Sequence, residues 1–478
     1  MEEDLKHKTK VSIYWKFFEQ IFTNGMQFIV SIIMARILTP EDYGITALPA
    51  IFLAIAATLI DSGFGLALVR KTKVTEKDLS TAFYYSIVLG IVLYIIIFFS
   101  APWIASFYDV PVLTSLMRIT AITFLISPIT IPQNVILQRR LDFKTPARIS
   151  VTNKLVSAIL GIVAAYFGYG LWSLVIYSLS YTLLGLVQIW IVVKWIPKER
   201  FDKDSFKYLW NFGNKLMASG LLGTIFNNLA PAIIGKYIGP FELGLFNRAN
   251  GYSRLPYQQV TASVQSVTFP VLSRLQNDED ALIRNYNRIV KTVCFIYFPI
   301  MLLLVALARP LVLIMLTEKW EQCIPLLQIL CFVTITGPLS VLNMNVIQVK
   351  GYTNLYLKAD VYKKSIEVII MVITMPIGLT IYCLGLVVSQ IFALYINFSC
   401  VSKVISLGIQ KQIKEILSSL ILAVIMMCIV FFVNSFITSL YLKLLFGSSI
   451  GLIFYFVIAY ILKFPEMEDL LFLLKFKK

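Results

Sequence analysis

The chain has 478 residues, of which 58% are hydrophobic and only 14% charged, and its mean hydropathy is +0.79. A soluble domain carries roughly 25% charged residues, so this composition excludes a soluble protein. The net charge of +16 does not indicate nucleic-acid binding, because the basic residues punctuate apolar runs and do not cluster on a polar domain. One membrane helix needs roughly 20 mostly apolar residues, and the chain holds enough for about fourteen.

The hydropathy pattern predicts an all-α integral membrane protein with about fourteen transmembrane helices. In the connecting loops, 31 basic residues fall on one side and five on the other. The positive-inside rule therefore predicts a multi-pass protein of the inner (cytoplasmic) membrane with both termini in the cytoplasm. We expect spans at residues 11–36, 44–69, 81–105, 112–137, 149–167, 171–193, 208–235, 243–271, 290–315, 325–348, 362–379, 382–402, 415–435 and 441–462.

Polar residues within the first two spans indicate a hydrated surface or a helix interface, because lipid-facing positions tolerate few polar groups. The first span carries Gln27 on a polar face, with the acidic Glu19 beside that face. The second span carries a single acid, Asp61. Glu19 and Asp61 could bind a coupling H⁺ or Na⁺, or they could form salt bridges with Lys215 or another base. Both interpretations stay open from sequence.

The seventh and eighth spans are the corresponding polar helices of the second half. The seventh is rich in glycine and carries Lys215, so close helix packing and cavity lining are both consistent with it. In the eighth span, polar residues recur at spacings of three and four positions, which predicts one polar helix face. Arg248 lies on the adjacent ridge of the same helix. A hydrated cavity explains that face better than an interhelical hydrogen-bonded seam, because an arginine in a seam needs an acidic partner. The face comprises Asn247, Asn250, Arg254, Gln258, Thr261, Gln265 and Thr268.

Basic groups in such a cavity would attract an anionic headgroup such as a diphosphate, through charge and bidentate hydrogen bonds. No cluster of histidine, cysteine and carboxylate residues predicts a metal site, and no Walker A loop predicts nucleotide hydrolysis. We therefore expect no catalytic residues and no cofactor. Asp202 and Asp204 form a DKD motif, which we interpret as part of a solvated loop and not as the metal-binding element of a glycosyltransferase.

The chain also contains a weak internal repeat. RILTPEDYG at 36–44 aligns with KYIGPFELG at 236–244, and Pro128 aligns with Pro338 at a slightly longer offset. Six spans separate the copies, so the two halves share one orientation in the membrane, an arrangement common in transporters. The repeat predicts an N-terminal lobe at 1–200, a C-terminal lobe at 201–405, and two further helices with a cytoplasmic tail at 406–478.

Four segments resemble the polysaccharide-transporter branch of the multidrug/oligosaccharidyl-lipid/polysaccharide exporter superfamily, especially its O-antigen flippase and colanic-acid-exporter-like members. The resemblance runs from about residue 10 to 465. It implies two six-helix lobes that form a V around a central cavity, with two C-terminal helices appended. The segments are ARILTPEDYGITALPAIF (35–52), IDSGFGLALVRK (60–71), LGLFNRANGYSRLP (243–256) and FPVLSRLQND (269–278).

The same resemblance implies a flippase that moves an undecaprenyl-diphosphate-linked oligosaccharide, such as an O-antigen, capsule or exopolysaccharide repeat unit, from the cytoplasmic to the periplasmic leaflet. Its expected partners are this lipid-linked oligosaccharide, membrane lipids and other glycan-assembly membrane proteins, and not nucleic acid. One alternative is a cation-coupled drug or small-solute exporter, which the basic polar faces disfavour. Another is a membrane-embedded enzyme of the glycan pathway, which the short outer loops disfavour.

Overall fold

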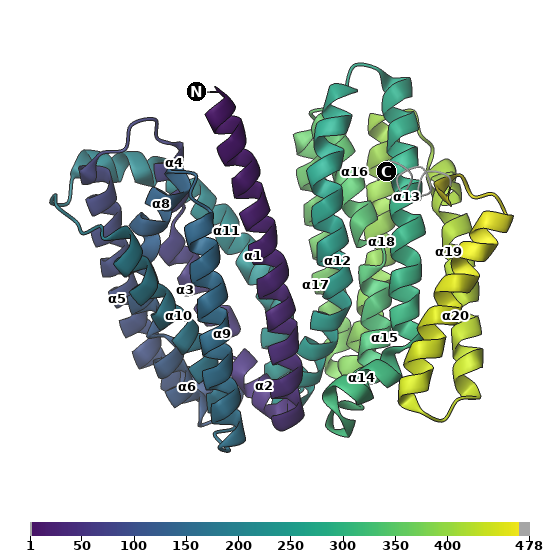
Figure 1. The fold of residues 1–478 in the computed structure, drawn as a ribbon, viewed down its shortest axis with the longest axis horizontal. Coiled ribbons are helices and arrows are strands. Elements are labelled where there is room, and N and C mark those ends of the chain that lie inside the picture. The colour runs from purple at the N-terminus through teal and green to yellow at the C-terminus, as the bar shows by residue number, and fades with distance from the viewer. Residues whose placement is uncertain (1, 468–478) are drawn as a thin grey trace. The chain divides into compact units, whose positions relative to one another are not determined.

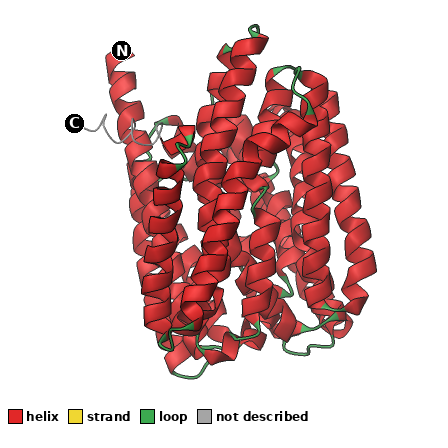
Figure 2. Ribbon diagram, turned by 90° about the vertical axis from the view of Figure 1, so that its right-hand side faces the viewer, coloured by secondary structure: helices red, strands yellow, loops and turns green. Residues whose placement is uncertain are grey.

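The computed structural model describes residues 2–467, and the side chains of residues 14–467. Within this part of the chain all regular secondary structure is helical (Figure 2). The chain divides into two compact units, Met1–Gly244 and Leu245–Lys478. Figure 1 colours the first from purple to teal and the second from teal through green to yellow.

The first unit holds eleven α-helices and one short 3-10 helix. α1 packs on α9, α9 packs on α10, and α3 packs on α11. These elements are α1 (Glu2–Ile37), α2 (Pro40–Ala47), α3 (Ala50–Asp61), α4 (Phe64–Arg70), α5 (Glu76–Tyr108), α6 (Leu113–Thr120), α7 (Thr123–Ile126), η1 (Ser127–Thr130), α8 (Ile131–Arg139), α9 (Lys144–Tyr166), α10 (Trp172–Val193) and α11 (Lys203–Tyr237).

α12 (Pro240–Arg274) begins in the first unit and continues into the second. In the second unit α13 packs on α19, α17 packs on α18, and α18 also contacts α15 and α16. The remaining elements are α13 (Glu279–Ala306), α14 (Ala308–Leu316), η2 (Glu318–Trp320), α15 (Cys323–Thr334), α16 (Gly337–Val349), α17 (Thr353–Thr374), η3 (Met375–Ile377), α18 (Leu379–Val404), α19 (Ile409–Ser435) and α20 (Leu440–Ile461).

Eleven helices in the described residues are long and apolar enough to cross a membrane, and each coincides with one of the fourteen predicted spans. The other three predicted spans correspond to α1, α12 and α17, which are long enough but too polar. Two of these, α1 and α12, carry the polar faces seen in the sequence. The total of fourteen therefore stays a prediction.

The predicted lobe boundary at residue 200 differs from the boundary of the compact units at residue 244, because α11 packs on α3, α4 and α5 of the first unit. The lobes at 1–200 and 201–405 rest on the internal repeat and stay a prediction. Of the C-terminal segment predicted at 406–478, α19 and α20 are present, whereas residues 468–478 lie outside the described part of the chain.

Two predicted spans are interrupted at corresponding places in the repeat. The helix run Leu113–Arg139 changes to a 3-10 turn at Pro128, and the run Cys323–Val349 breaks before α16, which has Pro338 in its first turn. Proline lacks the backbone N–H that an α-helix interior requires, but it fits the first turn of a new helix. The two aligned prolines thus have the same structural role.

The repeated segments 36–44 and 236–244 also contact each other within the first unit. A Cβ added at Gly44 would lie 2.5 Å from the carbonyl carbon of Pro240, and one added at Gly244 would lie 2.7 Å from the carbonyl carbon of Pro40. Each glycine therefore packs against the backbone of the other copy. Only glycine permits this approach, since any side chain would overlap the opposing helix start.

Candidate functional site

The polar face of α12 is the main candidate surface. Because α12 is continuous from Pro240 to Arg274, residues spaced by three and four positions lie on one side of it. Arg254 and Gln258 are exposed, and Asn247 and Asn250 are half-buried. The structure therefore confirms the helix on which the predicted polar face depends.

Arg254 has an acidic neighbour that the sequence did not single out. Its guanidinium is within electrostatic range of the Glu367 carboxylate on α17 and of the Tyr382 hydroxyl on α18. Glu367 is exposed, and no ion pair within 4.0 Å joins it to Arg254 among the described contacts. The sequence could have identified Glu367, because it is a lone acid in the otherwise apolar stretch 365–374 and such residues inside spans usually mark functional or paired positions.

Arg248 lies in different surroundings. Its guanidinium is 5.3 Å from the ring of the fully buried Trp320 and 5.9 Å from the ring of Tyr252. Arg248 precedes Arg254 by six positions, which places it about 120° away around the helix. The structure therefore does not bring the two arginines to one surface of α12, and Arg248 packs on an aromatic core.

In the first unit, Gln27 of α1 belongs to a polar cluster with α9 and α10. Lys154 donates a hydrogen bond to Gln27 Oε1 at 2.6 Å, and its ammonium lies 5.4 Å and 5.2 Å from the ring centres of Tyr177 and Tyr181. Lys154 was not predicted as a site residue. It is the single basic residue within the apolar part of α9, so its isolation in a predicted span was the signal.

The two predicted ion-coupling acids differ in their contacts. Glu19 forms an ion pair with Lys16, one turn earlier in α1, at 3.0 Å. Asp61 is exposed at the end of α3, directly before Ser62 and Gly63, which both adopt left-handed backbone conformations. The described ion pair of Glu19 thus involves a local lysine and not Lys215. An ion-binding role for either acid stays a prediction.

The break between α3 and α4 is held by α11, the helix that carries Lys215. Gly213 packs against the Ser62 carbonyl, and the hydroxyls of Thr58 and Thr224 are hydrogen-bonded at 2.9 Å. Lys215 itself is exposed on α11. Interrupted membrane helices leave backbone groups available to ligands, so Asp61 and the following break are a second candidate surface.

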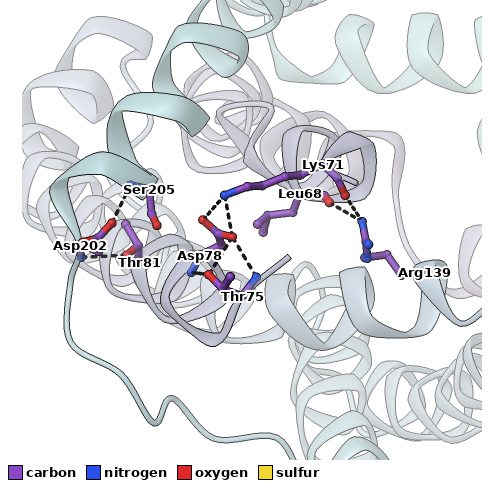
Figure 3. Close-up of polar contacts among 8 residues, drawn as sticks. All are labelled: Leu68, Lys71, Thr75, Asp78, Thr81, Arg139, Asp202 and Ser205. Atoms are coloured by element: carbon purple, nitrogen blue, oxygen red, sulfur yellow. Dashed lines mark hydrogen bonds and ion pairs between the residues drawn. The ribbon is translucent and has the colours of Figure 1, made fainter. Parts of the chain in front are cut away.

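One end of the first unit is fixed by a buried ion pair (Figure 3). Lys71 contacts both carboxylate oxygens of Asp78 at 2.7 and 2.8 Å, and the Asp78 side chain is fully buried. Asp78 also accepts hydrogen bonds from the backbone N–H and hydroxyl of Thr75, which completes a capping box for α5. Arg139 of α8 donates to carbonyls at the end of α4, including that of Leu68.

Asp202, part of the DKD motif, caps α11 beside this ion pair. The Ser205 backbone N–H donates to its carboxylate at 2.8 Å, and the Asp202 N–H donates to the Thr81 hydroxyl at 3.0 Å (Figure 3). The hydrogen bonds from Ser205 lower the pKa of the Asp202 carboxyl. Among the described residues no group of three or more histidine, cysteine or acidic side chains could hold a metal ion. Asp202 caps α11, and Asp204 lies in the first turn of that helix and not in the predicted loop.

Comparisons with known proteins identify the family. A family model described as "Polysaccharide biosynthesis protein" matches residues 33–325, which is more than half of the chain. The teichuronic acid biosynthesis protein TuaB of Bacillus subtilis is 29% identical over 305 residues, 63% of this chain and 62% of TuaB, so the match spans less than two thirds of that relative. The lipopolysaccharide biosynthesis protein WzxC of Escherichia coli is 22% identical over 75% of this chain and 73% of its own length.

Solved structures show the same fold. The lipid II flippase MurJ in an inward closed conformation matches with a TM-score of 0.72 at 16% identity, over 95% of this chain and 99% of MurJ. An inward-facing multidrug resistance transporter of the MATE family matches with a TM-score of 0.61 at 17% identity, over 80% of this chain and 94% of its own. The chain therefore belongs to the polysaccharide biosynthesis protein family, and its fold is similar to that of these two solved membrane proteins.

Proposed function

We propose that this protein is a flippase that moves an undecaprenyl-diphosphate-linked oligosaccharide from the cytoplasmic to the periplasmic leaflet by alternating access. Membership of the family supports the link to polysaccharide synthesis, and relatives named for teichuronic acid and lipopolysaccharide biosynthesis support a cell-surface glycan as cargo. In this proposal the two lobes enclose the transport cavity, and both termini lie in the cytoplasm.

The observation that carries the proposal is the exposed Arg254 on the polar face of α12. A guanidinium at membrane depth is costly unless an anion or water compensates it. Glu367 is near enough to moderate this charge, but among the described contacts it forms no ion pair within 4.0 Å of the guanidinium. Arg254 therefore keeps donors available for the two charged groups of a diphosphate, which a planar guanidinium can bind in bidentate geometry.

Glu367 has a defined part in this proposal. Its carboxylate balances Arg254 when no substrate is bound, and it repels a diphosphate that has bound. A transporter must release its cargo, so a nearby acid that competes for the same guanidinium favours turnover. Gln258 and Asn250, one turn away on either side of Arg254, offer neutral hydrogen-bonding groups to the sugar or phosphate oxygens.

The proposal is tested by complementation of a strain that lacks this transporter, with surface glycan measured and membrane expression checked. Arg254→Ala should abolish glycan display, because loss of charge-assisted hydrogen bonds worth about 2 kcal/mol weakens diphosphate binding roughly 30-fold. Arg254→Lys should keep partial activity, because the charge stays while the bidentate geometry is lost. Lys443→Ala, in the last pair of helices, is the control and should be silent.

Full complementation by a normally expressed Arg254→Ala protein would refute the role of this residue. Glu367→Gln adds a sharper test in reconstituted liposomes, where it should strengthen diphosphate-lipid binding while slowing release. The alternative function, export of a drug or small solute, predicts the opposite result: strains without the protein would lose efflux of organic cations and keep normal surface glycan.

A further inference from the structure

A basic cavity lies within the second unit. Its volume is about 540 Å³, and it is lined by residues 284–292 of α13, by residues 411–415 of α19 and by the segment that follows α20. Neither the predicted substrate site nor the predicted ion-coupling residues lie in this cavity. The side chains relevant to its chemistry are Arg284, Asn287, Arg288, Lys291, Lys411 and Glu466.

The sequence builds the cavity from two amphipathic helix starts. In α13, Arg284, Arg288 and Lys291 recur at helical spacing on one face, while Tyr286 and Val290 are buried on the other. In α19, Lys411 faces the cavity, while Gln412 is buried. The two helices pack closely against each other, and their charged residues therefore line the same cavity.

The charge of the cavity favours an anion. Four basic side chains line it against two acidic ones, Glu415 and Glu466. Lys291 is neutralised by Glu415, since the two are joined by an ion pair of 2.5 Å. Arg284 and Lys411 are exposed to the cavity, and their long side chains can reach a phosphate placed in it.

The cavity also contains two acceptors without hydrogen-bond partners among the described residues. These are Asn287 Oδ1 and Glu466 Oε2, both buried atoms, and the whole Glu466 residue is only 4% exposed. Because both atoms have almost no accessible surface, they belong to the packed wall of the cavity, and the groups open to a ligand are the basic ones.

The depth of the cavity matches the headgroup layer of a bilayer. Both helices change from charged to apolar sequence directly beyond it: α13 continues as VCFIYFPIMLLLVA after Thr292, and α19 continues as ILSSLILAVIMMCIVFFVNS after Glu415. The positive-inside pattern assigns this end of both helices to the cytoplasmic side. Basic clusters at this level attract anionic lipids.

We propose that this cavity binds the headgroup of an anionic phospholipid, such as phosphatidylglycerol, from the cytoplasmic leaflet. The lipid phosphate contacts Arg284 and Lys411. The bound lipid joins the start of α13 to the start of α19 and the segment after α20. The site is independent of Arg254 and of the transported substrate.

The test uses the full-length protein in a neutral detergent, with thermal unfolding followed during titration with dioleoyl phosphatidylglycerol. A ligand that binds the native state raises Tm with increasing concentration. For Arg284→Ala/Lys411→Ala, removal of two basic groups worth about 1 kcal/mol each should weaken the apparent lipid affinity roughly 30-fold. The matched control, Lys358→Ala/Lys403→Ala, removes two exposed lysines of the same unit that do not line the cavity, and should bind as the unmodified protein does.

Three further arms identify the ligand. Dioleoyl phosphatidylcholine should give no specific shift, whereas phosphatidic acid, which is also anionic, should raise Tm as phosphatidylglycerol does. Inorganic phosphate should not compete, and competition would assign the cavity to a free anion and overturn the lipid. Arg284→Lys/Lys411→Arg preserves the charge and should preserve lipid selectivity. An unchanged phosphatidylglycerol titration for a folded Arg284→Ala/Lys411→Ala protein would also overturn the proposal.

Discussion

The reciprocal contact of Gly44 and Gly244 allows a quantitative test of the fold. Replacement of Gly44 by alanine places a Cβ 2.5 Å from the carbonyl carbon of Pro240, and replacement of Gly244 places one 2.7 Å from that of Pro40. Real Cβ atoms essentially never approach other atoms closer than 3.0 Å. The opposing atoms are backbone and cannot rotate away, so the starts of α2 and α12 would have to separate by about 1 Å or more.

Such overpacking costs about 2 kcal/mol. For a unit of this size that free energy corresponds to a fall in Tm of roughly 4–8 °C. The assay is thermal unfolding of the purified protein, followed by circular dichroism in detergent. Gly251→Ala is the matched control in α12, because an added Cβ there meets nothing within 4 Å. Since alanine favours helix over glycine, that control should be neutral or slightly stabilising.

The double variant Gly44→Ala/Gly244→Ala distinguishes a shared contact from two separate ones. If one separation of the two helix starts relieves both overlaps, the double variant should cost clearly less than the sum of the single variants. Equal Tm values for Gly44→Ala, Gly244→Ala and Gly251→Ala would refute the close backbone packing. Full additivity would refute the claim that the two contacts are one interface.

The remaining predictions concern the ion pair in Figure 3, the helix cap beside it and the orientation in the membrane. Asp78→Ala should lower the free energy of unfolding by about 3–5 kcal/mol, measured by chemical denaturation, because it leaves the partly buried Lys71 unpaired and removes a helix cap; an effect equal to that of exposed Lys77→Ala would contradict this. Hydrogen bonds lower the pKa of Asp202 below 3.8, so its ionised form stabilises the fold above that pH and loses this effect as the pH falls through the lowered pKa. Asp202→Asn should therefore unfold at a lower Tm than the unmodified protein at pH 6, with the difference shrinking below pH 3.8; a difference independent of pH would exclude a contribution from the charge. In a cysteine-free background, Glu318→Cys should react with an impermeant thiol reagent added outside intact cells and Lys73→Cys should not; the reverse pattern would invert the predicted topology.

Local periodicity was enough to identify most of the architecture. Apolar runs of about twenty residues predicted the helices, and eleven of them satisfy the length and composition of a membrane span. The polar face through Asn250, Arg254 and Gln258 was readable because helix geometry alone places those positions on one side of α12. The motifs at 35–52 and 243–256 were sufficient for the family resemblance, which the matching family model confirms.

Contacts between helices could not be read in this way, because periodicity identifies a polar face but not the helix that packs against it. Glu367 near Arg254, Lys154 on Gln27, and Trp320 against Arg248 each depend on which helices are neighbours and how they are rotated. The aligned segments 36–44 and 236–244 revealed a repeat, yet only the tertiary structure showed that their glycines pack against each other's backbone. Sequence spacing reports angles around one helix axis, whereas these contacts are set by distances between axes, which arise from packing of the whole unit.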